Sequence, residues 1–183
     1  MILDTECFEI KGLKKFIIKK YIDNRGEFSE VFLANTKHSE LCLNYVQDNE
    51  SISNFGVFRG MHFQKDNYSQ NKLVRVVKGK VIDVICDLRK SSTTFKKIIT
   101  INLSPNNILF IPCGIAHGFL SLEDDTILNY KSDCYFNPEK EGGFNLFKSN
   151  FKNKFPIGVD KIILSDKDKR LPSMDKTYIF NNL

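Results

Sequence analysis

Short apolar runs that end in turn residues recur along most of the chain. They are rich in Val, Ile and Phe, and many are followed by Asn, Asp, Gly or a Lys-Gly pair, as is typical of β-strands. We predict strands over residues 16–22, 26–33, 44–53, 56–64, 73–77, 80–88, 97–103, 108–111, 117–122 and 127–132. Such closely spaced strands indicate an all-β sandwich or barrel. Helical periodicity is scarce, and we expect only short helices, near residues 36–43 and close to the C-terminus.

The clearest strand pair lies in residues 73–88, LVRVVKGKVIDVICDL. Its two β-branched runs meet at Lys78 and Gly79, and a glycine there supplies the positive φ of a tight hairpin. Asp83 and Asp87 alternate with apolar residues in the second run, so we expect one face of that strand to be packed and the other partly wet.

The chain has 183 residues, of which 42% are hydrophobic, a balance that suits one domain with a substantial core. Because neither a repeat nor a linker-like stretch interrupts the sequence, we expect a single domain over residues 1–183, with an irregular tail from about 150 to 183.

The net charge of +5 comes from Lys and Arg spread along the whole length, so we expect no nucleic-acid partner. The N-terminal stretch lacks a signal-peptide pattern, and no apolar run reaches the roughly 18 residues of a membrane span. We therefore expect a cytoplasmic protein without a membrane partner. The five cysteines are scattered without a CxxC pair, which favours buried free thiols over disulfides or a zinc site.

Three histidines are candidates for chemistry. His38 lies in the polar stretch NTKHSE and has the weakest case for a functional role. His62 lies in FRGMHFQ, a strand in which strict alternation places it and Arg59 on opposite faces. A strand histidine is more often structural, but Arg59 nearby and Lys72 at the start of the next strand put cationic groups beside this imidazole, as a phosphate-bearing substrate requires.

His117 lies in IPCGIAHGFLSL, which contains PxGxxH, the second signature of cupin barrels. In metal-binding cupins this histidine joins two histidines and a glutamate from an earlier motif. The corresponding region here, RGMHFQ, holds one histidine. We therefore predict a cupin-like β jelly-roll barrel with a few short helices and no metal, in which His117 has a binding or structural role.

Seven segments, in this order, together resemble the dTDP-4-dehydrorhamnose 3,5-epimerase family. They are DNRGEFSEVF, QDNESIS, VFRGMHFQ, KLVRVVKGKVIDVICDLRKSSTTF, IPCGIAHGF, NYKSDCYFNPEKE and ILSDKD. The resemblance runs from about residue 23 to residue 173. It implies an isomerase without a cofactor, acting as a homodimer on a nucleotide-linked 4-keto sugar, with dTDP-4-dehydro-6-deoxyglucose as the preferred substrate.

The resemblance also implies catalytic roles. His62 is the general base, supported by Asp168, and Tyr130 returns a proton on the opposite face of the sugar. Lys72 matches the family position near the 4-keto group. These roles are chemically sensible, because removing a proton beside a ketone moves charge onto the keto oxygen, where a cation stabilises it.

For binding, the resemblance implies contacts to nucleotide, phosphate or sugar from Arg25, Phe28, Glu30, Gln47, Asn49, Arg59, His117 and Glu141. Gln47 and Asn49 are two apart on a strand and therefore share a face. In relatives the Arg25 segment reaches the neighbouring subunit's barrel, which implies the dimer. Since alternation separates Arg59 from His62, we predict a β-bulge at Gly60 that brings them to one face.

The chain departs from the family pattern at three places. QKDNYSQNK after His62 lacks the paired prolines common in relatives, Phe136 stands where many have a second tyrosine, and Lys167 replaces an arginine. A C3-only epimerase or an enzyme for a GDP-linked 4-keto heptose is therefore an alternative. Alternatives of other classes are a non-catalytic sugar-nucleotide-binding cupin and a metal-dependent cupin isomerase or oxygenase.

Overall fold

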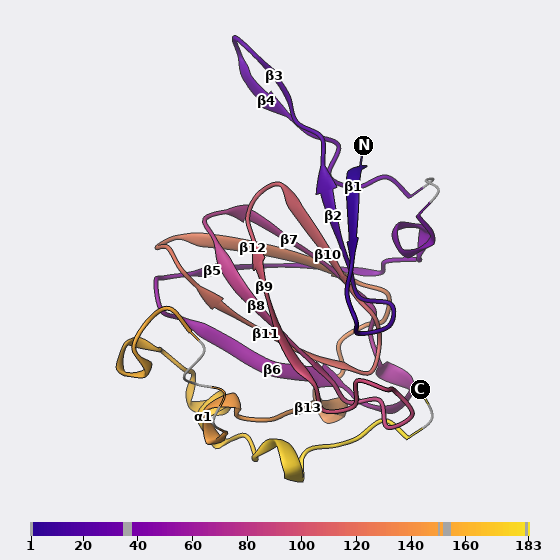
Figure 1. Ribbon diagram of the computed structural model, residues 1–183, viewed down its shortest axis with the longest axis vertical. Helices are drawn as coiled ribbons and strands as arrows, with labels where there is room; N and C mark the ends of the chain where they lie inside the picture. Colours follow the sequence, from indigo (N-terminus) through magenta and orange to yellow (C-terminus); the bar gives the residue numbers. More distant parts are fainter. Residues whose placement is uncertain (1, 35–37, 150, 152–154, 182) are drawn as a thin grey trace.

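Two antiparallel sheets face each other across the centre of the molecule (Figure 1). The computed structural model describes residues 2–34, 38–149, 151, 155–181 and 183. The six-stranded sheet contains, in spatial order, β1 (Ile2–Cys7), β2 (Lys14–Ile18), β10 (Asn107–Ile111), β7 (Lys72–Lys78), β12 (Thr126–Ser132) and β5 (Gln47–Ser53). The five-stranded sheet contains β13 (Glu141–Gly143), β6 (Phe58–Gln64), β11 (Ile115–Ser121), β8 (Val81–Asp87) and β9 (Ile98–Leu103). This arrangement confirms the predicted all-β, cupin-like jelly roll.

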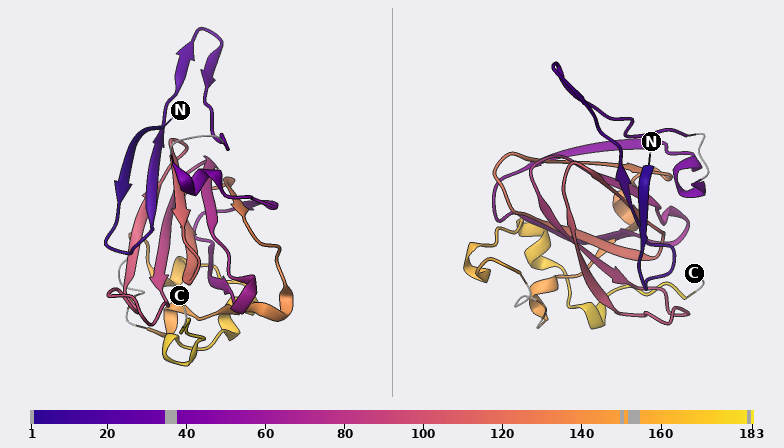
Figure 2. Two further views of the ribbon diagram at one scale, coloured as in Figure 1. Left: turned by 90° about the vertical axis from the view of Figure 1, so that its right-hand side faces the viewer. Right: turned by 45° about the horizontal axis from the view of Figure 1, so that its top comes forward.

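A third, two-stranded sheet is a hairpin of β3 (Tyr21–Asp23) and β4 (Gly26–Phe28) that projects beyond the barrel (Figure 2). The helices are all short. The α-helix α1 covers Asp166–Arg170, and 3₁₀ turns cover Ser39–Cys42, Asp66–Tyr68, Pro138–Lys140, Leu146–Lys148, Val159–Lys161 and Met174–Lys176. Of the helix expected over 36–43, residues 36 and 37 lie outside the described residues, and the 3₁₀ turn at Ser39–Cys42 covers part of the rest. The expected C-terminal helix corresponds to α1.

The predicted hairpin at Lys78 and Gly79 is wrong. Gly79 does have a positive φ of 84°, but β7 belongs to the six-stranded sheet and β8 to the five-stranded sheet. The turn therefore carries the chain from one sheet to the other. The local pattern shows a turn between two strands, but it does not show which neighbours each strand pairs with, because that depends on segments distant in sequence.

Strand β8 also differs from its prediction, since every residue in it is buried. It lies between β11 and β9, and Asp83 and Asp87 have no exposed surface. The face expected to be partly wet instead turns toward the other sheet. Here the apolar residues of both sheets meet, among them Val74, Val76, Ile85, Leu109, Phe119 and Leu128.

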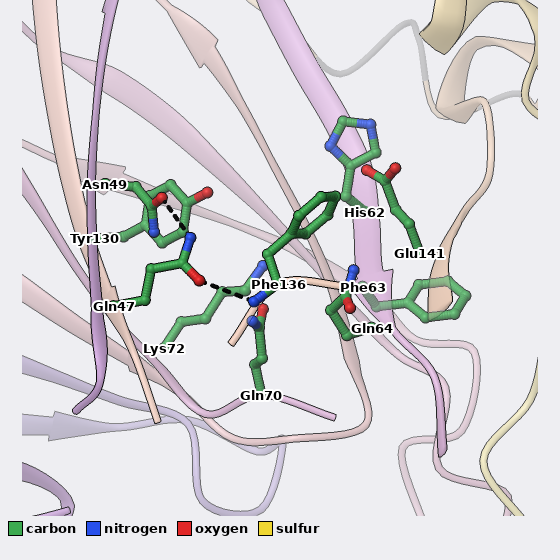
Figure 3. A pocket seen from close by; sticks show the side chains of 10 residues that line it. All are labelled: Gln47, Asn49, His62, Phe63, Gln64, Gln70, Lys72, Tyr130, Phe136 and Glu141. Carbon is green, nitrogen blue, oxygen red and sulfur yellow. Dashed lines mark hydrogen bonds between the residues drawn. The ribbon is translucent and has the colours of Figure 1, made fainter. Parts of the chain in front are cut away.

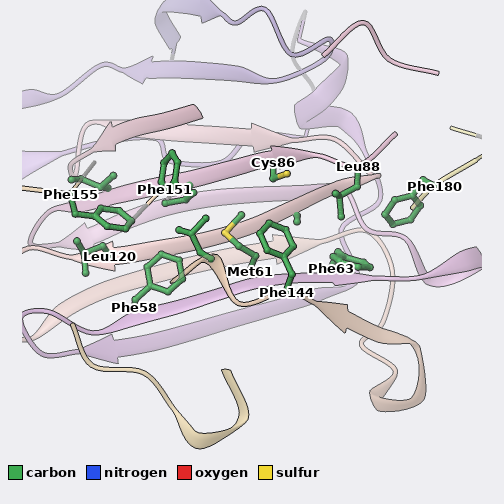
Figure 4. Close-up of a cluster of buried hydrophobic side chains, with 14 residues drawn as sticks. Phe58, Met61, Phe63, Cys86, Leu88, Leu120, Phe144, Phe151, Phe155 and Phe180 are labelled. Atoms are coloured by element: carbon green, nitrogen blue, oxygen red, sulfur yellow. The ribbon is translucent and has the colours of Figure 1, made fainter. Parts of the chain in front are cut away.

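The outer face of the five-stranded sheet is covered by the C-terminal part of the chain (Figure 4). Phenylalanines dominate this cluster, and several of their rings meet edge to face, for example Phe58 with Phe147 at a centroid distance of 5.1 Å. Burying each such ring contributes about 1.5–3 kcal/mol. Because Phe58, Met61 and Phe63 of β6 all belong to the cluster, the opposite face of β6 is held toward the barrel interior.

The five cysteines are free, and only Cys86 is fully buried. The prediction of buried thiols is wrong for Cys7 and Cys42, which are exposed. No helix in the described part of the chain has the length and apolar character needed to cross a membrane.

Candidate active site

Two adjoining cavities, of about 260 and 560 Å³, lie within the barrel and share His62, Tyr130, Asn49 and Glu141. Figure 3 shows how side chains from both sheets point into the smaller one. His62 and Tyr130 come from opposing sheets, on β6 and β12. The two cavities together have the size and the mixed polar lining of a small-molecule site.

His62 is held by Asp168. Its Nε2 lies 2.6 Å from a carboxylate oxygen of Asp168, which is 5% exposed, whereas the imidazole is 29% exposed. Burial alone would raise the pKa of Asp168, but the His62 imidazole, the Gly60 amide and the Ser165 hydroxyl together hold that pKa below its usual value. An ionised carboxylate only accepts hydrogen bonds, so Nε2 carries the proton and Nδ1 is left as the basic nitrogen.

Asp168 is placed by the start of α1. The Ser165 side chain caps this helix and accepts a hydrogen bond from the Asp168 amide at 3.1 Å. The Gly60 amide lies 3.5 Å from the second carboxylate oxygen of Asp168. The C-terminal segment thus provides the partner of His62, although 106 residues separate the two in sequence.

Arg59 and His62 both line the larger cavity, as the predicted bulge requires. Along the β6–β11 pair, His62 lies opposite His117 and Arg59 lies opposite Phe119, so three steps on β6 match two on β11. The bulge near Gly60 is therefore confirmed. Gly60 has a φ of 128°, and a Cβ there would come within 2.6 Å of the Gly118 Cα, so a side chain does not fit.

Tyr130 stands on the side of the cavity opposite His62. Burial, reinforced by the negative charge of Glu141, raises the pKa of its phenol above the usual 10.0. The Lys72 ammonium lies 5.5 Å from the centroid of the Tyr130 ring. Burial lowers the pKa of Lys72 to about 8, while Glu141 and Asp83 oppose that shift. Tyr130 therefore keeps its proton at neutral pH, and Lys72 is mostly charged.

Gln47 and Asn49 share one face of β5, as predicted, and both line the smaller cavity. The Gln47 amide donates to Asn49 Oδ1 at 2.9 Å, and its oxygen accepts from the Phe136 amide at 2.8 Å. The Asn49 Nδ2 is buried without a hydrogen-bond acceptor among the described residues. It is therefore a donor available to a ligand.

Glu141 lines both cavities, and both of its carboxylate oxygens lie 2.6 Å from the Lys167 ammonium. The pair lies at the rim, with Lys167 more than half exposed. Arg59 is also near the surface, where its guanidinium donates to the Ser53 hydroxyl and to the Ile52 carbonyl at 3.1 Å each. Two cations, Lys167 and Arg59, thus line the larger cavity.

His117 is largely buried, at 9% exposed. Its Nε2 lies 2.5 Å from a carboxylate oxygen of Asp83 on β8. It faces the barrel interior on β11, directly beside His62 on β6. It therefore belongs to the inner wall of the barrel rather than to the residues that line the cavity openings.

Arg25, Phe28 and Glu30 lie away from this chain's own cavity. Arg25 and Phe28 belong to the projecting hairpin, where Arg25 pairs with Asp23 at 2.6 Å and Phe28 is 65% exposed. Glu30 follows β4 in a segment without regular structure. Within one chain, the structure does not bring these three residues to His62.

Several cavity residues were not predicted from the sequence. Phe63, Gln64, Gln70 and Phe136 line the smaller cavity, and Lys167 and Ser165 line the larger one. In the sequence, Phe136 and Lys167 stand out only as departures from a family pattern. Gln64 lies on the same face of β6 as His62, so alternation along that strand is the signal that identifies it.

Across the described ranges, no group of three or more His, Cys, Asp or Glu side chains is placed to hold a metal ion.

The chain is similar to a set of known sugar-nucleotide epimerases. A family model described as dTDP-4-dehydrorhamnose 3,5-epimerase matches residues 7–176. The dTDP-4-dehydrorhamnose 3,5-epimerase of Methanothermobacter thermautotrophicus is 43% identical over 164 residues, which cover 87% of this chain and 88% of that protein. The enzyme of the same name from Escherichia coli K12 is 41% identical over 160 residues, 84% and 85% of the two chains.

Solved structures agree with these relatives. The dTDP-6-deoxy-D-glucose-3,5-epimerase of Legionella pneumophila, determined in complex with dTDP-4-keto-L-rhamnose, superposes with a TM-score of 0.89 at 33% identity. The superposition covers 98% of each chain. The dTDP-4-dehydrorhamnose 3,5-epimerase of Sulfolobus tokodaii gives a TM-score of 0.88 at 34% identity and covers 99% of this chain and all of that one.

Proposed function

This chain belongs to the dTDP-4-dehydrorhamnose 3,5-epimerase family, and from that membership we propose how its residues carry out the reaction. It is an isomerase that acts on a nucleotide-linked 4-keto sugar and inverts carbon centres next to the keto group. The observation that carries the mechanism is the His62–Asp168 pair on one wall of the cavity, with Tyr130 and Lys72 on the other.

In the first step, His62 Nδ1 takes a proton from the carbon beside the keto group. The electron pair of the broken C–H bond forms a C=C bond, and the carbonyl electrons move onto the keto oxygen to give an enolate. Asp168 keeps the imidazole oriented through Nε2 and balances the positive charge that His62 acquires. The oxidation state of the sugar does not change.

Lys72 stabilises the enolate. A protonated ammonium in a cavity that excludes most water interacts strongly with a developing oxyanion. Lys72 is partly buried and carries its proton below its pKa of about 8. We assign it the keto oxygen of the substrate as its partner.

Tyr130 completes the inversion by donating its phenolic proton to the opposite face of the carbon. The enolate collapses back to the ketone. Before the next turnover, His62 releases to solvent the proton that it removed, and the phenolate regains a proton from solvent. Because base and acid come from opposing sheets, the sugar lies between them. Returning the proton from the face opposite to that of its removal is what inverts the centre.

The remaining cavity residues bind the substrate. Arg59 and Lys167 line the larger cavity and suit a diphosphate, since both are cations near its rim. Gln47, Asn49 and Glu141 suit the hydroxyls of the sugar, and the unpartnered Asn49 amide supports this role. His117, on the inner wall of the barrel beside His62, supports the part of the cavity that holds the sugar.

We further propose a homodimer in which the β3–β4 hairpin supplies Arg25, Phe28 and Glu30 to the partner's cavity. The hairpin projects beyond its own barrel and exposes apolar side chains, with Ile22 77% and Phe28 65% exposed. A second copy of the chain would cover this surface. A cytosolic location and a single domain over residues 1–183 remain predictions.

The test is proton NMR in deuterated water with dTDP-4-dehydro-6-deoxyglucose and a GDP-linked 4-keto sugar in parallel. We expect deuterium to enter at C3, at C5 or at both in the dTDP-linked sugar, with inversion of the exchanged centre. Faster exchange of the GDP-linked sugar would favour the alternative substrate. Binding without exchange of either compound would contradict the catalytic assignment.

A further inference from the structure

Residues 133–140 cross from one sheet to the other beside the smaller cavity. β12 of the six-stranded sheet ends at Ser132, and β13 of the five-stranded sheet begins at Glu141. The first five residues of this connection belong to no helix or strand. Even so, Phe136 lines the smaller cavity and Glu141 lines both cavities. Without strand pairing, such a segment places its side chains accurately only if other groups hold its main chain.

All three glutamines of the chain line the smaller cavity (Figure 3), and each is hydrogen-bonded to the main chain of residues 134–137. The Asn137 amide donates to Gln64 Oε1 at 3.0 Å. Gln70 Nε2 donates to the Cys134 carbonyl at 2.7 Å. The proposed function names no contact for either of these two glutamines. Every glutamine in the sequence is therefore attached to one short segment of the cavity wall.

The three hydrogen bonds attach the segment to both sheets. Gln47 begins β5 at the edge of the six-stranded sheet, and it accepts from the Phe136 amide at 2.8 Å. Gln64 ends β6 in the five-stranded sheet and is 4% exposed. Gln70 lies shortly before β7. Because the glutamines come from different elements, they fix the position of the segment relative to both walls of the barrel.

The hydrogen bond to Gln64 also helps to place Glu141. The Asn137 side chain accepts from the Glu139 amide at 2.9 Å and caps the 3₁₀ turn Pro138–Lys140. Glu141 follows this turn directly, and it lies opposite Gln64 in the pairing of β13 with β6. Holding the Asn137 amide thus fixes the start of the turn that brings Glu141 to the cavity.

Gln64 and Gln70 form these hydrogen bonds in opposite directions. A main-chain amide only donates, so Gln64 serves Asn137 as an acceptor. A carbonyl only accepts, so Gln70 serves Cys134 as a donor. A glutamate has the length of a glutamine and keeps acceptor oxygens, but it has no donor when it is ionised. Replacement by glutamate should therefore preserve the hydrogen bond of Gln64 and abolish that of Gln70.

We propose that Gln64 and Gln70 are positioning residues for substrate binding, which hold residues 134–137 so that Phe136 and Glu141 form one wall of the sugar site. The inference rests on the proposed function, because it takes the smaller cavity as the place of the sugar. Neither glutamine acts on the reacting carbon. Both act through the main chain of the segment, whose side chains face the substrate.

Amide hydrogen exchange, followed by NMR without substrate, tests the hydrogen bonds. The amides of Tyr135, Phe136 and Asn137 are consecutive, and in the described part of the chain only the last two donate to a glutamine. Relative to the rates of an unfolded chain, exchange at Phe136 and Asn137 should be at least about tenfold slower than at Tyr135. Gln64→Met keeps the side-chain length without the oxygen, and it should speed exchange at Asn137 about tenfold. Gln64→Glu should return that rate to within about twofold of wild type.

Steady-state kinetics with dTDP-4-dehydro-6-deoxyglucose test the consequence for binding. Gln64→Met and Gln70→Met should each raise KM about fivefold and keep kcat within about twofold, because the catalytic side chains lie on other segments. Gln64→Glu should bring KM back to within about twofold of wild type, whereas Gln70→Glu should be as impaired as Gln70→Met. The two glutamate variants are matched controls. Both add one negative charge beside the same cavity, so a difference between them reports the direction of the hydrogen bond and not the charge.

Equal KM values for Gln64→Glu and Gln64→Met would overturn the proposal, as would a wild-type KM in Gln70→Glu. A loss of kcat with an unchanged KM in Gln64→Met would also overturn it. If a variant does not fold, the exchange rates of the wild-type protein decide. Slow exchange at Asn137 relative to Tyr135 supports the proposal, and equal rates at the two amides overturn it.

These outcomes are separate from the fate of the epimerase mechanism. The amide exchange measurement needs no substrate, so its result does not depend on whether the protein acts on 4-keto sugars. A wild-type protein that brings no deuterium into these sugars would remove the proposed function. Deuterium incorporation into the sugar together with fast amide exchange at Asn137 would remove only the role of the glutamines.

Discussion

His62 and His117 are direct cross-strand partners on β6 and β11, and each imidazole is paired with a different aspartate. Their surroundings differ. The His62 side chain is 29% exposed toward the cavity, whereas the His117 side chain is 9% exposed and lies against the fully buried Asp83. Two similar His–Asp pairs thus lie side by side. The more exposed His62 is suited to take a proton from the substrate, whereas the buried His117 is suited to support the inner wall of the barrel.

Replacing His62 by alanine should abolish deuterium exchange at every carbon of the substrate. A positioned general base contributes about 10²–10⁴-fold in rate, and among the described residues that line the two cavities His62 is the only histidine. The measurement is exchange followed by NMR under single-turnover conditions. His38→Ala is the matched control, because His38 packs against the Phe16 ring outside the cavity, and it should exchange at the wild-type rate. Full exchange in His62→Ala would show that another group is the base.

Tyr130→Phe should separate exchange from inversion. Phenylalanine preserves the ring that packs near the Lys72 ammonium but removes the phenolic proton. The base still forms the enolate, so some exchange continues, while protonation from the opposite face slows by about 10²-fold. The measurement is the ratio of deuterium incorporated to product inverted, which should rise well above the wild-type ratio. An unchanged ratio would mean that Tyr130 does not return the proton.

Some residues of this site could be predicted from the sequence, and others could not. His62, Tyr130 and Lys72 could be assigned because their motifs match a family, and the bulge at Gly60 could be inferred because Arg59 and His62 have to share a face. The His62–Asp168 pair could be predicted only from the resemblance to a family. Asp168 is 106 residues from His62 in sequence, and its local sequence indicates only a charged loop. Asp83 was expected on a partly wet face, because one strand does not reveal that a second sheet covers it.

Activity should fall as pH rises through the pKa of Lys72, about 8. The charged ammonium is the form that stabilises the enolate, so its loss removes catalysis above that pH. Tyr130 does not account for this limb, because its pKa is raised above 10.0. Lys72→Arg should keep reduced activity without the limb, and Lys72→Met should lose about 10²–10³-fold in kcat at every pH. The measurement is kcat/KM against pH for the three proteins, and a limb that persists in Lys72→Arg would assign it to another group.

Gly60→Ala should destabilise the fold and disorganise the site. A Cβ at Gly60 would meet the Gly118 Cα at 2.6 Å, and we expect a loss of about 2–4 kcal/mol in the free energy of unfolding. Gly26→Ala is the control for backbone conformation alone, since its φ of 127° matches the 128° of Gly60 but no described atom lies within 4 Å of the added carbon. Thermal or urea unfolding should show the larger loss for Gly60→Ala. Equal losses of unfolding free energy in the two variants would mean that the backbone conformation, and not the contact with β11, causes the destabilisation.

The hairpin explains why residues implied to bind substrate lie outside their own cavity. The sequence predicted strands over residues 16–22 and 26–33, on either side of Arg25. The cavity that Arg25 and Phe28 reach depends on a second chain, which the local pattern does not describe. Ile22 and Phe28 are among the most exposed apolar side chains of the described residues, and they lie on a hairpin that projects beyond its own barrel in Figure 2. A dimer gives this exposure a physical reason.

Complementation between two inactive variants tests this dimer. His62→Ala lacks the base, and Arg25→Ala lacks the hairpin contact, so each homodimer should be impaired at both sites. In a mixed dimer, one cavity combines an intact His62 with an intact Arg25 from the other chain, while the second cavity lacks both. Random mixing after co-refolding makes about half of the dimers mixed, so activity should recover to about a quarter of the wild-type value. Absence of recovery, or a monomeric mass in light scattering, would contradict this dimer. Arg25 would then act within its own chain, and the exposed hairpin would have no partner.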